Sequence, residues 1–230
     1  MNYFDTYDKQ VKTETLLKMH GIPVDNKEIM DQMEIYPITY NYPEYNRDTQ
    51  TYVPKENQPH PRKGDPKNYD FDFKVVDLSK EEQDAIVKHL IQDAIVAIDK
   101  NTSDTILAGF DCKVNTDKGQ ETLHFSYDQF DQSNFTDSAV TAYAETGQVA
   151  SNASPTTVYW NGYRDYDKDQ KKGELVVLTL NAQTFLPIYN AALAHKSSNM
   201  AAGSQKRVEI AKKTTAAEIR EQMKEWGISF

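Results

Sequence analysis

The residues of this chain best suited to acid–base chemistry lie in one short stretch, HFSYDQFDQSNFTDSA, residues 124–139. His124 could serve as a general base with Asp128 orienting its ring, and Asp131 or Asp137 could supply a second carboxylate. Such a set would suit a hydrolase. The sequence adds no nucleophile elbow, no phosphate-binding glycine loop and no His-x-x-x-His pair.

A structural role explains the same residues more simply. Strand alternation would send His124 and Ser126 to one face and the neighbouring aromatic rings to the other. Asp128 and Asn134 could then cap the turns that follow, which is a common use of these residue types between aromatics. We therefore predict that the stretch is architectural, that no residue is catalytic and that the chain is not an enzyme.

Two other patterns bear on metal binding. The segment DYDKD at 165–169 has the alternating carboxylates of a calcium loop, but Gln170 replaces the glycine at the bend and Val176 replaces the bidentate glutamate. Cys112 is the single cysteine, and the five histidines show no ligand spacing. We predict a polar hairpin loop, a half-buried cysteine on a strand, no metal and no cofactor.

Aromatic residues offer the strongest binding alternative. In TVYWNGYRDY, three rings and an arginine could form a platform for a sugar, although strand alternation should bury at least one ring. Three more tyrosines lie in a proline-rich segment nearer the N-terminus. The candidate contacts with a partner protein or a saccharide are Tyr159, Trp160, Tyr163, Arg164, Tyr42, Tyr45 and Tyr52.

The composition excludes some classes of partner. The chain has 230 residues and a formal net charge of -9, and its mean hydropathy is -0.74. Negative charge disfavours nucleic-acid phosphates and anionic membranes, and no apolar run approaches the ~20 residues of a membrane span. The start MNYFDTYDKQ lacks the pattern of a signal peptide, so we expect synthesis in the cytoplasm without a translocation signal.

Residues 1–78 are predicted to form an N-terminal attachment region with short strands. Helical spacing is limited to two short pieces, the second marked by Ile29 and Met33. Frequent prolines after residue 35 argue against long regular strands. Alternation in TQTYV and FDFKVV predicts two short edge strands on either side of an extended or disordered loop at 54–68.

A connecting amphipathic helix is predicted over 79–101. Ser79 and Glu82 form a capping box, and helical spacing continues to about Lys100. Its apolar stripe must be covered by the rest of the chain or by copies of itself. The stripe comprises Ile86, Val87, Leu90, Ile91, Ala94, Ile95 and Ile98.

Residues 104–230 are predicted to form a C-terminal α+β domain after a turn-rich joint at 101–104. ILAGFDCKVN and ETLHFSYD are strands around a reversal at 117–119, and TVYWNGY and ELVVLTL flank a polar loop. A helix over 182–213 would be capped by Thr179 or Asn181.

A second capping box at 215–218 starts a last helix, which Gly227 ends. Short antiparallel strands with two or three packed helices, rather than alternating strand–helix units, indicate the α+β class.

The order HFSYDQFDQSNF, VYWNGY, GELVVLTLNAQTFLPIYNAALAHKSSNM and KKTTAAEIREQM resembles a domain of uncharacterised function that ends many bacteriophage tail-fibre and tail-fibre-assembly proteins. The likeness covers about 105–226. The front of the chain, YPITYNYPEYNRDTQTYVPKE followed by FKVVDLSKEEQDA, is similar to phage tail accessory proteins. That family supplies no catalytic residue.

The resemblance implies an accessory protein of the host-adhesion apparatus, made in the host cytoplasm and placed in the virion tail or acting as an assembly chaperone. Its expected partners are the tail fibre, baseplate or receptor-binding protein of the same phage. We also consider a homo-oligomer through the 79–101 helix, and expect neither nucleic acid nor membrane as a partner. The alternatives are a carbohydrate-binding tip protein that uses Trp160 and, less favoured, a cell-wall-active hydrolase that uses His124 with Asp128 and Asp131.

Overall fold

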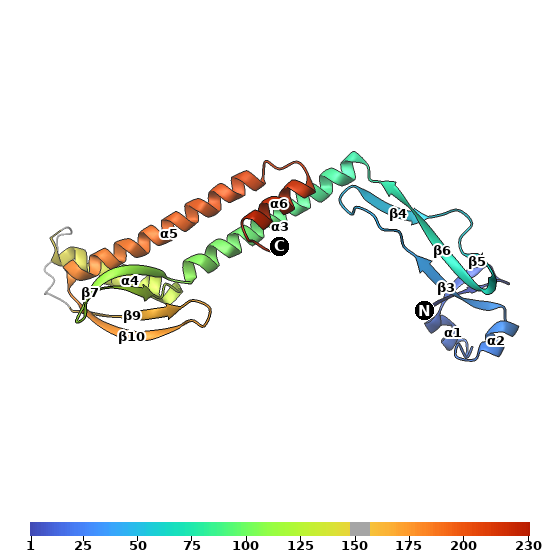
Figure 1. The fold of residues 1–230 in the computed structure, drawn as a ribbon, viewed down its shortest axis with the longest axis horizontal. Coiled ribbons are helices and arrows are strands. Elements are labelled where there is room, and N and C mark those ends of the chain that lie inside the picture. The colour runs from blue at the N-terminus through green and yellow to red at the C-terminus, as the bar shows by residue number, and fades with distance from the viewer. Residues whose placement is uncertain (148–156) are drawn as a thin grey trace. The chain divides into compact units, whose positions relative to one another are not determined.

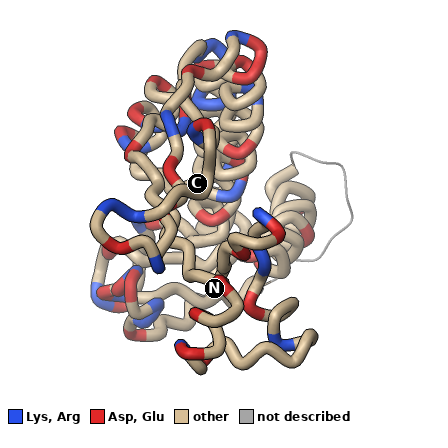
Figure 2. The backbone as a smooth tube through the Cα atoms, turned by 90° about the vertical axis from the view of Figure 1, so that its right-hand side faces the viewer, with Lys and Arg blue, Asp and Glu red and all other residues tan. Residues whose placement is uncertain are grey.

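The computed structural model describes residues 1–147 and 157–230 and confirms the α+β class (Figure 1). The chain divides into two compact units, Met1–Ile86 and Val87–Phe230. In Figure 2 basic and acidic residues are interspersed along the backbone, without a block of either sign.

The first unit is built on a six-stranded sheet. Its strand order is β2-β1-β3-β6-β4, and β5 pairs with β6. The strands β3 and β6 are parallel, and the other pairs are antiparallel. The elements are β1 (Asn2–Asp5), β2 (Gln10–Thr13), α1 (Glu14–Met19), α2 (Lys27–Gln32), β3 (Ile35–Asn41), β4 (Gln50–Pro54), β5 (His60–Arg62) and β6 (Asp65–Asp77).

Of the two short edge strands predicted around a loop, the first is confirmed as β4, a five-residue strand at the edge of the sheet. The second strand and the loop were predicted wrongly. FDFKVV belongs to β6, a 13-residue strand that lies inside the sheet, and part of the expected loop forms β5. The prolines do not prevent this, because Pro54 ends β4, Pro61 lies in the three-residue β5 and Pro66 follows the first residue of β6. Proline costs least at strand ends and on peripheral strands.

The N-terminal helices also differ from the expected pattern. Met30 is buried with Leu17, Tyr3 and Ile35, whereas Met33 is exposed. The spacing of Ile29 and Met33 therefore misplaced the buried face by one residue, and the two N-terminal strands were missed.

The helix α3 (Lys80–Leu107), which begins in the first unit and continues in the second, is longer than predicted. The capping box is confirmed, since the Glu82 amide donates to Ser79 Oγ and the Ser79 amide donates to Glu82 Oε2. The turn expected at 101–104 is wrong. The hydroxyls of Thr102 and Thr105 each donate to the carbonyl four residues earlier, so these polar residues bond within the helix instead of ending it.

Four antiparallel strands follow in the order β10-β9-β8-β7. They are β7 (Phe110–Thr116), β8 (Gly119–Phe125), β9 (Val158–Asp167) and β10 (Lys172–Leu180). The reversal at 117–119 and the hairpin of β9 and β10 are confirmed. The helices are α4 (Gln129–Glu145), α5 (Ala182–Ile210) and α6 (Ala216–Glu225). Asn181 caps α5, and Thr215 with Glu218 forms the capping box of α6.

The second unit has two hydrophobic cores. Side chains of α4 and α5, among them Phe135 and Phe185, pack on one face of the four-stranded sheet. The other core joins Ala94 and Ile98 of α3 to Ile210 and to α6, and Figure 1 shows α5 and α6 beside α3. The apolar stripe of α3 is thus covered at these positions by the same chain.

Where α3 and α5 approach each other, Gly203 faces Thr102. A Cβ atom at residue 203 would lie 2.3 Å from Thr102 Oγ1. The glycine therefore sets how closely these two helices pack.

We expect Gly203→Ala to lower the free energy of unfolding, because overpacking costs ~1–3 kcal/mol and outweighs the ~1 kcal/mol gained in helix propensity. Thr102→Ala removes the clashing hydroxyl, so the double variant should recover most of that loss. Urea unfolding of the four proteins in this double-mutant cycle measures the coupling. Additive effects would contradict the close approach.

Candidate functional site

One face of the first unit's sheet carries a cluster of six rings, which we call the aromatic surface. Strand pairing creates it from residues that are far apart in the sequence. Tyr40 of β3 lies opposite Phe71 of β6, and Tyr52 of β4 lies opposite Val75. Because side chains alternate along a strand, Phe71 and Phe73 share this face. The aromatic surface consists of Tyr40, Tyr42, Tyr45, Tyr52, Phe71 and Phe73.

These rings are close-packed but remain accessible. Tyr42 stacks on Phe73 with 4.7 Å between ring centroids, and Tyr45 meets Tyr52 edge-on at 5.2 Å. Tyr42 is 59% exposed, and the other five rings are half-buried. The unit's helices α1 and α2 lie against β2 and β3. The structure thus brings together Tyr42, Tyr45 and Tyr52, three of the predicted contact residues.

The opposite face of β6 is polar and internally paired. Arg62 donates to Asp70 from Nε and Nη2, and also to Thr39 Oγ1. This guanidinium lowers the pKa of Asp70. Asp72 accepts from the Asn41 amide at 2.8 Å. The two faces of the sheet therefore differ in chemistry. The polar side chains of one face are bonded to each other, whereas the rings of the aromatic face remain accessible for contact with a partner.

The four candidates on β9 do not form one platform. Trp160 points into the core, with its ring centroid 4.0 Å from that of Phe135. Tyr159 lies on the opposite face of the strand and is 71% exposed. Tyr163 packs against Tyr166 at 5.8 Å. The tryptophan is thus a packing residue, as alternation allowed for at least one ring.

Arg164 is held by two carboxylates. It donates to Glu121 from Nε at 2.6 Å and from Nη2 at 2.8 Å, and to Glu174 from Nη1 at 2.7 Å. These bonds, with one from the Thr116 hydroxyl, lower the pKa of Glu121 from its ordinary value of 4.5 to about 2. The same carboxylates raise the pKa of Arg164.

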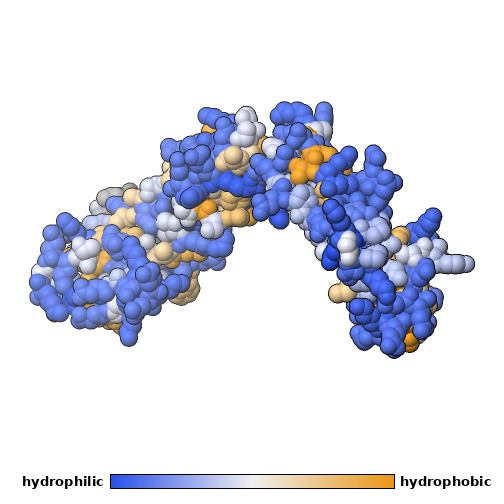
Figure 3. Space-filling view, turned by 45° about the vertical axis from the view of Figure 1, so that its right-hand side comes forward, coloured by the Kyte–Doolittle hydropathy of each residue, from blue (hydrophilic) through white to orange (hydrophobic). Residues whose placement is uncertain are grey.

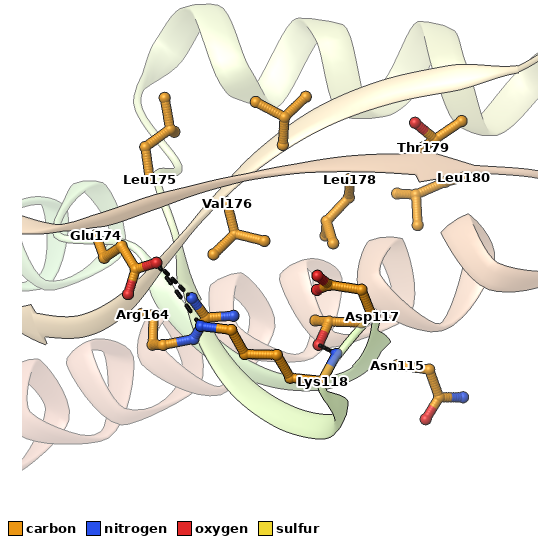
Figure 4. A pocket seen from close by; sticks show the side chains of 12 residues that line it. Asn115, Asp117, Lys118, Arg164, Glu174, Leu175, Val176, Leu178, Thr179 and Leu180 are labelled. Carbon is orange, nitrogen blue, oxygen red and sulfur yellow. Dashed lines mark hydrogen bonds and ion pairs between the residues drawn. The ribbon is translucent and has the colours of Figure 1, made fainter.

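This ion-pair cluster closes one end of a pocket of about 440 Å³ (Figure 4). Val176, Leu178 and Leu180 of β10 point into it, and Lys118 approaches from the hairpin of β7 and β8. The arginine's charge is already neutralised there. The pocket therefore offers a mixed lining along a strand rather than a charged binding centre.

His124 is buried in the second unit and both of its ring nitrogens are in use. Nδ1 lies 2.7 Å from Asp111 Oδ1, Nε2 lies 3.0 Å from the Ala108 carbonyl oxygen, and the ring stacks on Tyr166 at 3.9 Å. A cleft of about 750 Å³ passes this histidine. The contact of Nε2 with a backbone carbonyl holds the ring against the end of α3.

The other members of the proposed catalytic set serve α4. Asp128, whose side chain accepts from the Asp131 amide at 2.8 Å, caps the helix as predicted. Asn134 lies inside the helix, so its predicted capping role was wrong. The partner of His124 is Asp111, which the catalytic hypothesis missed. The two are opposite each other in the β7–β8 register, and the hairpin predicted at 117–119 implies this pairing.

The DYDKD segment ends β9 and turns the hairpin. Asp167 Oδ1 accepts from the amides of Asp169 and Gln170, which confirms the predicted hairpin loop. Within 1–147 and 157–230, no three histidine, cysteine, aspartate or glutamate residues are grouped as metal ligands would be. No helix in this described part is both long and apolar enough to span a bilayer.

Together these features define an α+β protein with an aromatic-faced sheet and a second, helix-covered sheet. Residues 90–223 match the family described as domain of unknown function DUF4376. The match covers more than half of the chain, so the chain belongs to this family. No curated protein and no solved structure is significantly similar to it.

The ion pair of Glu121 makes stability depend on pH. Because folding lowers the pKa of Glu121 to about 2, its contribution is complete above about pH 4.5 and is lost as the pH falls toward 2. We expect Glu121→Gln to be less stable than wild type at pH 7, with the difference shrinking over that window. Urea unfolding between pH 2 and pH 7 tests this.

Glu174→Gln is the matched control, because it removes the partner of the same arginine that is 59% exposed and should cost less. A Glu121→Gln deficit that stays constant with pH would contradict the assignment.

Trp160→Ala should destabilise the second unit by roughly 3 kcal/mol because it empties part of the core. Tyr159→Ala, on the exposed side of the same strand, should change stability by less than about 0.5 kcal/mol. Chemical denaturation measures both. A stable Trp160→Ala protein that lost binding to host cell walls would instead support the saccharide hypothesis.

Proposed function

We propose that this chain is a bacteriophage tail accessory protein that docks on the tail fibre, baseplate or receptor-binding protein through the aromatic surface. It acts as a virion component or an assembly chaperone, and its action involves no catalysis. The observation that carries the proposal is the cluster of accessible rings on one sheet face of the first unit. The resemblance of the chain to tail-fibre and tail-accessory proteins supplies the class of partner.

Ring chemistry favours a protein as the partner. Tyrosine and phenylalanine are enriched in protein interfaces, where they bury a large area at low entropy cost and leave a hydroxyl for hydrogen bonding. In the aromatic surface the rings already hold one another in place, as with Tyr42 and Tyr52 at 5.3 Å. Little side-chain freedom is left to lose on binding, which favours affinity.

Electrostatics supports the same choice. The charge of -9 disfavours phosphate-rich partners, and on the opposite face of β6 Asp70 and Asp72 accept hydrogen bonds from Arg62 and Asn41. The surface drawn in Figure 3 is mostly hydrophilic, with hydrophobic residues in small separate areas. On a surface of this kind, a contiguous cluster of accessible rings favours an interaction site.

Complementation of a gene deletion tests the function. Phage lacking this gene should yield particles that are defective in fibre assembly or in adsorption, and the wild-type gene should restore them. The Tyr42→Ser/Tyr52→Ser double variant should fail to do so, because losing anchor rings costs about 2 kcal/mol or more, or about 30-fold in affinity. Adsorption rate and mass spectrometry of purified particles are the measurements.

Tyr7→Ser is the control, since Tyr7 is 87% exposed in the same unit but lies outside the aromatic surface. It should complement fully. Thermal unfolding of all three purified proteins separates lost docking from lost folding. Fully adhesive particles without the gene would refute the proposed function.

A further inference from the structure

The strand β10 ends the four-stranded sheet of the second unit. Within the described residues its only strand partner is β9. The pocket of about 440 Å³ follows the same strand from Glu174 to Leu180 and is bounded on its other side by the tip of the β7–β8 hairpin, residues 115–118. An unpaired edge presents a row of backbone donors and acceptors that another strand can use.

The side chains of this edge are unusually apolar for an exposed strand. Leu175 and Val177 are 53% and 62% exposed on the face away from the helices. On the other face, Val176 and Leu178 reach toward the pocket. From Leu175 to Leu180 the strand has no charged residue and no proline. The usual features that protect an edge from pairing, charges, prolines and bulges, are absent from this segment.

We propose that β10 pairs with β10 of a second copy of this chain, antiparallel and about a two-fold axis through Val177, to form a continuous eight-stranded sheet. This inference concerns the second unit alone and does not depend on the proposed function. A two-fold axis perpendicular to the sheet places the helix-covered faces of both copies on the same side of the joined sheet.

The pairing is self-complementary in chemistry. About this axis Val177 meets Val177 of the other copy, Leu175 meets Thr179, and Val176 meets Leu178. Each is an apolar or β-branched match of the kind that stabilises neighbouring strands. The single charge in the paired segment, Glu174, would lie opposite Leu180 and is already bound to Arg164 at 2.7 Å.

Charge also favours this edge as the place where two copies meet. Each chain carries -9, so most surfaces of two copies would repel each other at close range. The uncharged segment from Leu175 to Leu180 brings no like charges together in this register. Its exposed valine and leucine would be removed from water in the same step.

Sedimentation velocity on the full chain over a range of concentrations tests the proposal. The wild-type protein should form a dimer, and Val177→Lys, which would place two ammonium groups opposite each other, should raise the dimer dissociation constant at least tenfold. Val208→Lys is the matched control, because Val208 is 57% exposed on α5, away from the strand. It should leave the constant unchanged. Circular dichroism confirms that both variants fold.

Cross-linking tests the register. In a Cys112→Ser background, differently tagged Leu175→Cys and Thr179→Cys copies should be joined by a short bis-maleimide faster than two Leu175→Cys copies. A monomeric wild-type chain, or a dimer insensitive to Val177→Lys, would overturn the proposal. So would an edge that binds only a different protein, or equal cross-linking in the two mixtures.

Discussion

The second unit depends on the long helix α5, whose side chains pack in both of its hydrophobic cores. Near its start, Phe185 and Ile188 pack on the four-stranded sheet, and at its end Ile210 packs on α3 and α6. Between these two ends, Gly203 of α5 has no side chain, and Thr102 of α3 occupies the space that a methyl group at residue 203 would need. Because α5 contributes side chains to both cores, its distance from α3 bears on the packing of each. The sheet can therefore leave one face and one edge without cover and still be held in place.

The first unit's sheet also has one face whose groups are bonded within the protein and one face that remains accessible. There the sheet is held by pairing rather than by a long helix, since β6 bonds to three other strands. Its polar face is satisfied by ion pairs and hydrogen bonds such as that of Arg62 with Asp70. The rings of the other face cover one another only in part.

Local signals predicted the start of α3 and much of the second unit. The capping residues Ser79, Asn181 and Thr215 and the hairpin at 117–119 depend on neighbouring residues only, and the structure confirms them. Predictions failed where distant residues decide the outcome. Polar residues after Lys100 stay helical because α3 continues to pack at Ile106. The aromatic surface requires the parallel pairing of β3 with β6, whose register no local pattern reveals. The tyrosines were recognisable as contact residues, but their assembly with Phe71 and Phe73 was not.

His124 shows why residue types alone do not define an active site. An imidazole, a carboxylate and an adjacent cleft meet in the second unit, which is the set of groups that a hydrolase would need. Here Asp111 and the Ala108 carbonyl take both ring nitrogens, and Tyr166 covers the ring. The Ala108 carbonyl oxygen can only accept a hydrogen bond, so Nε2 donates to it. Gly109, with a positive φ of 89°, brings the chain so near that a Cβ there would lie 2.7 Å from Nε2. The histidine thus joins the end of α3 to the β7–β8 hairpin, beside the cleft.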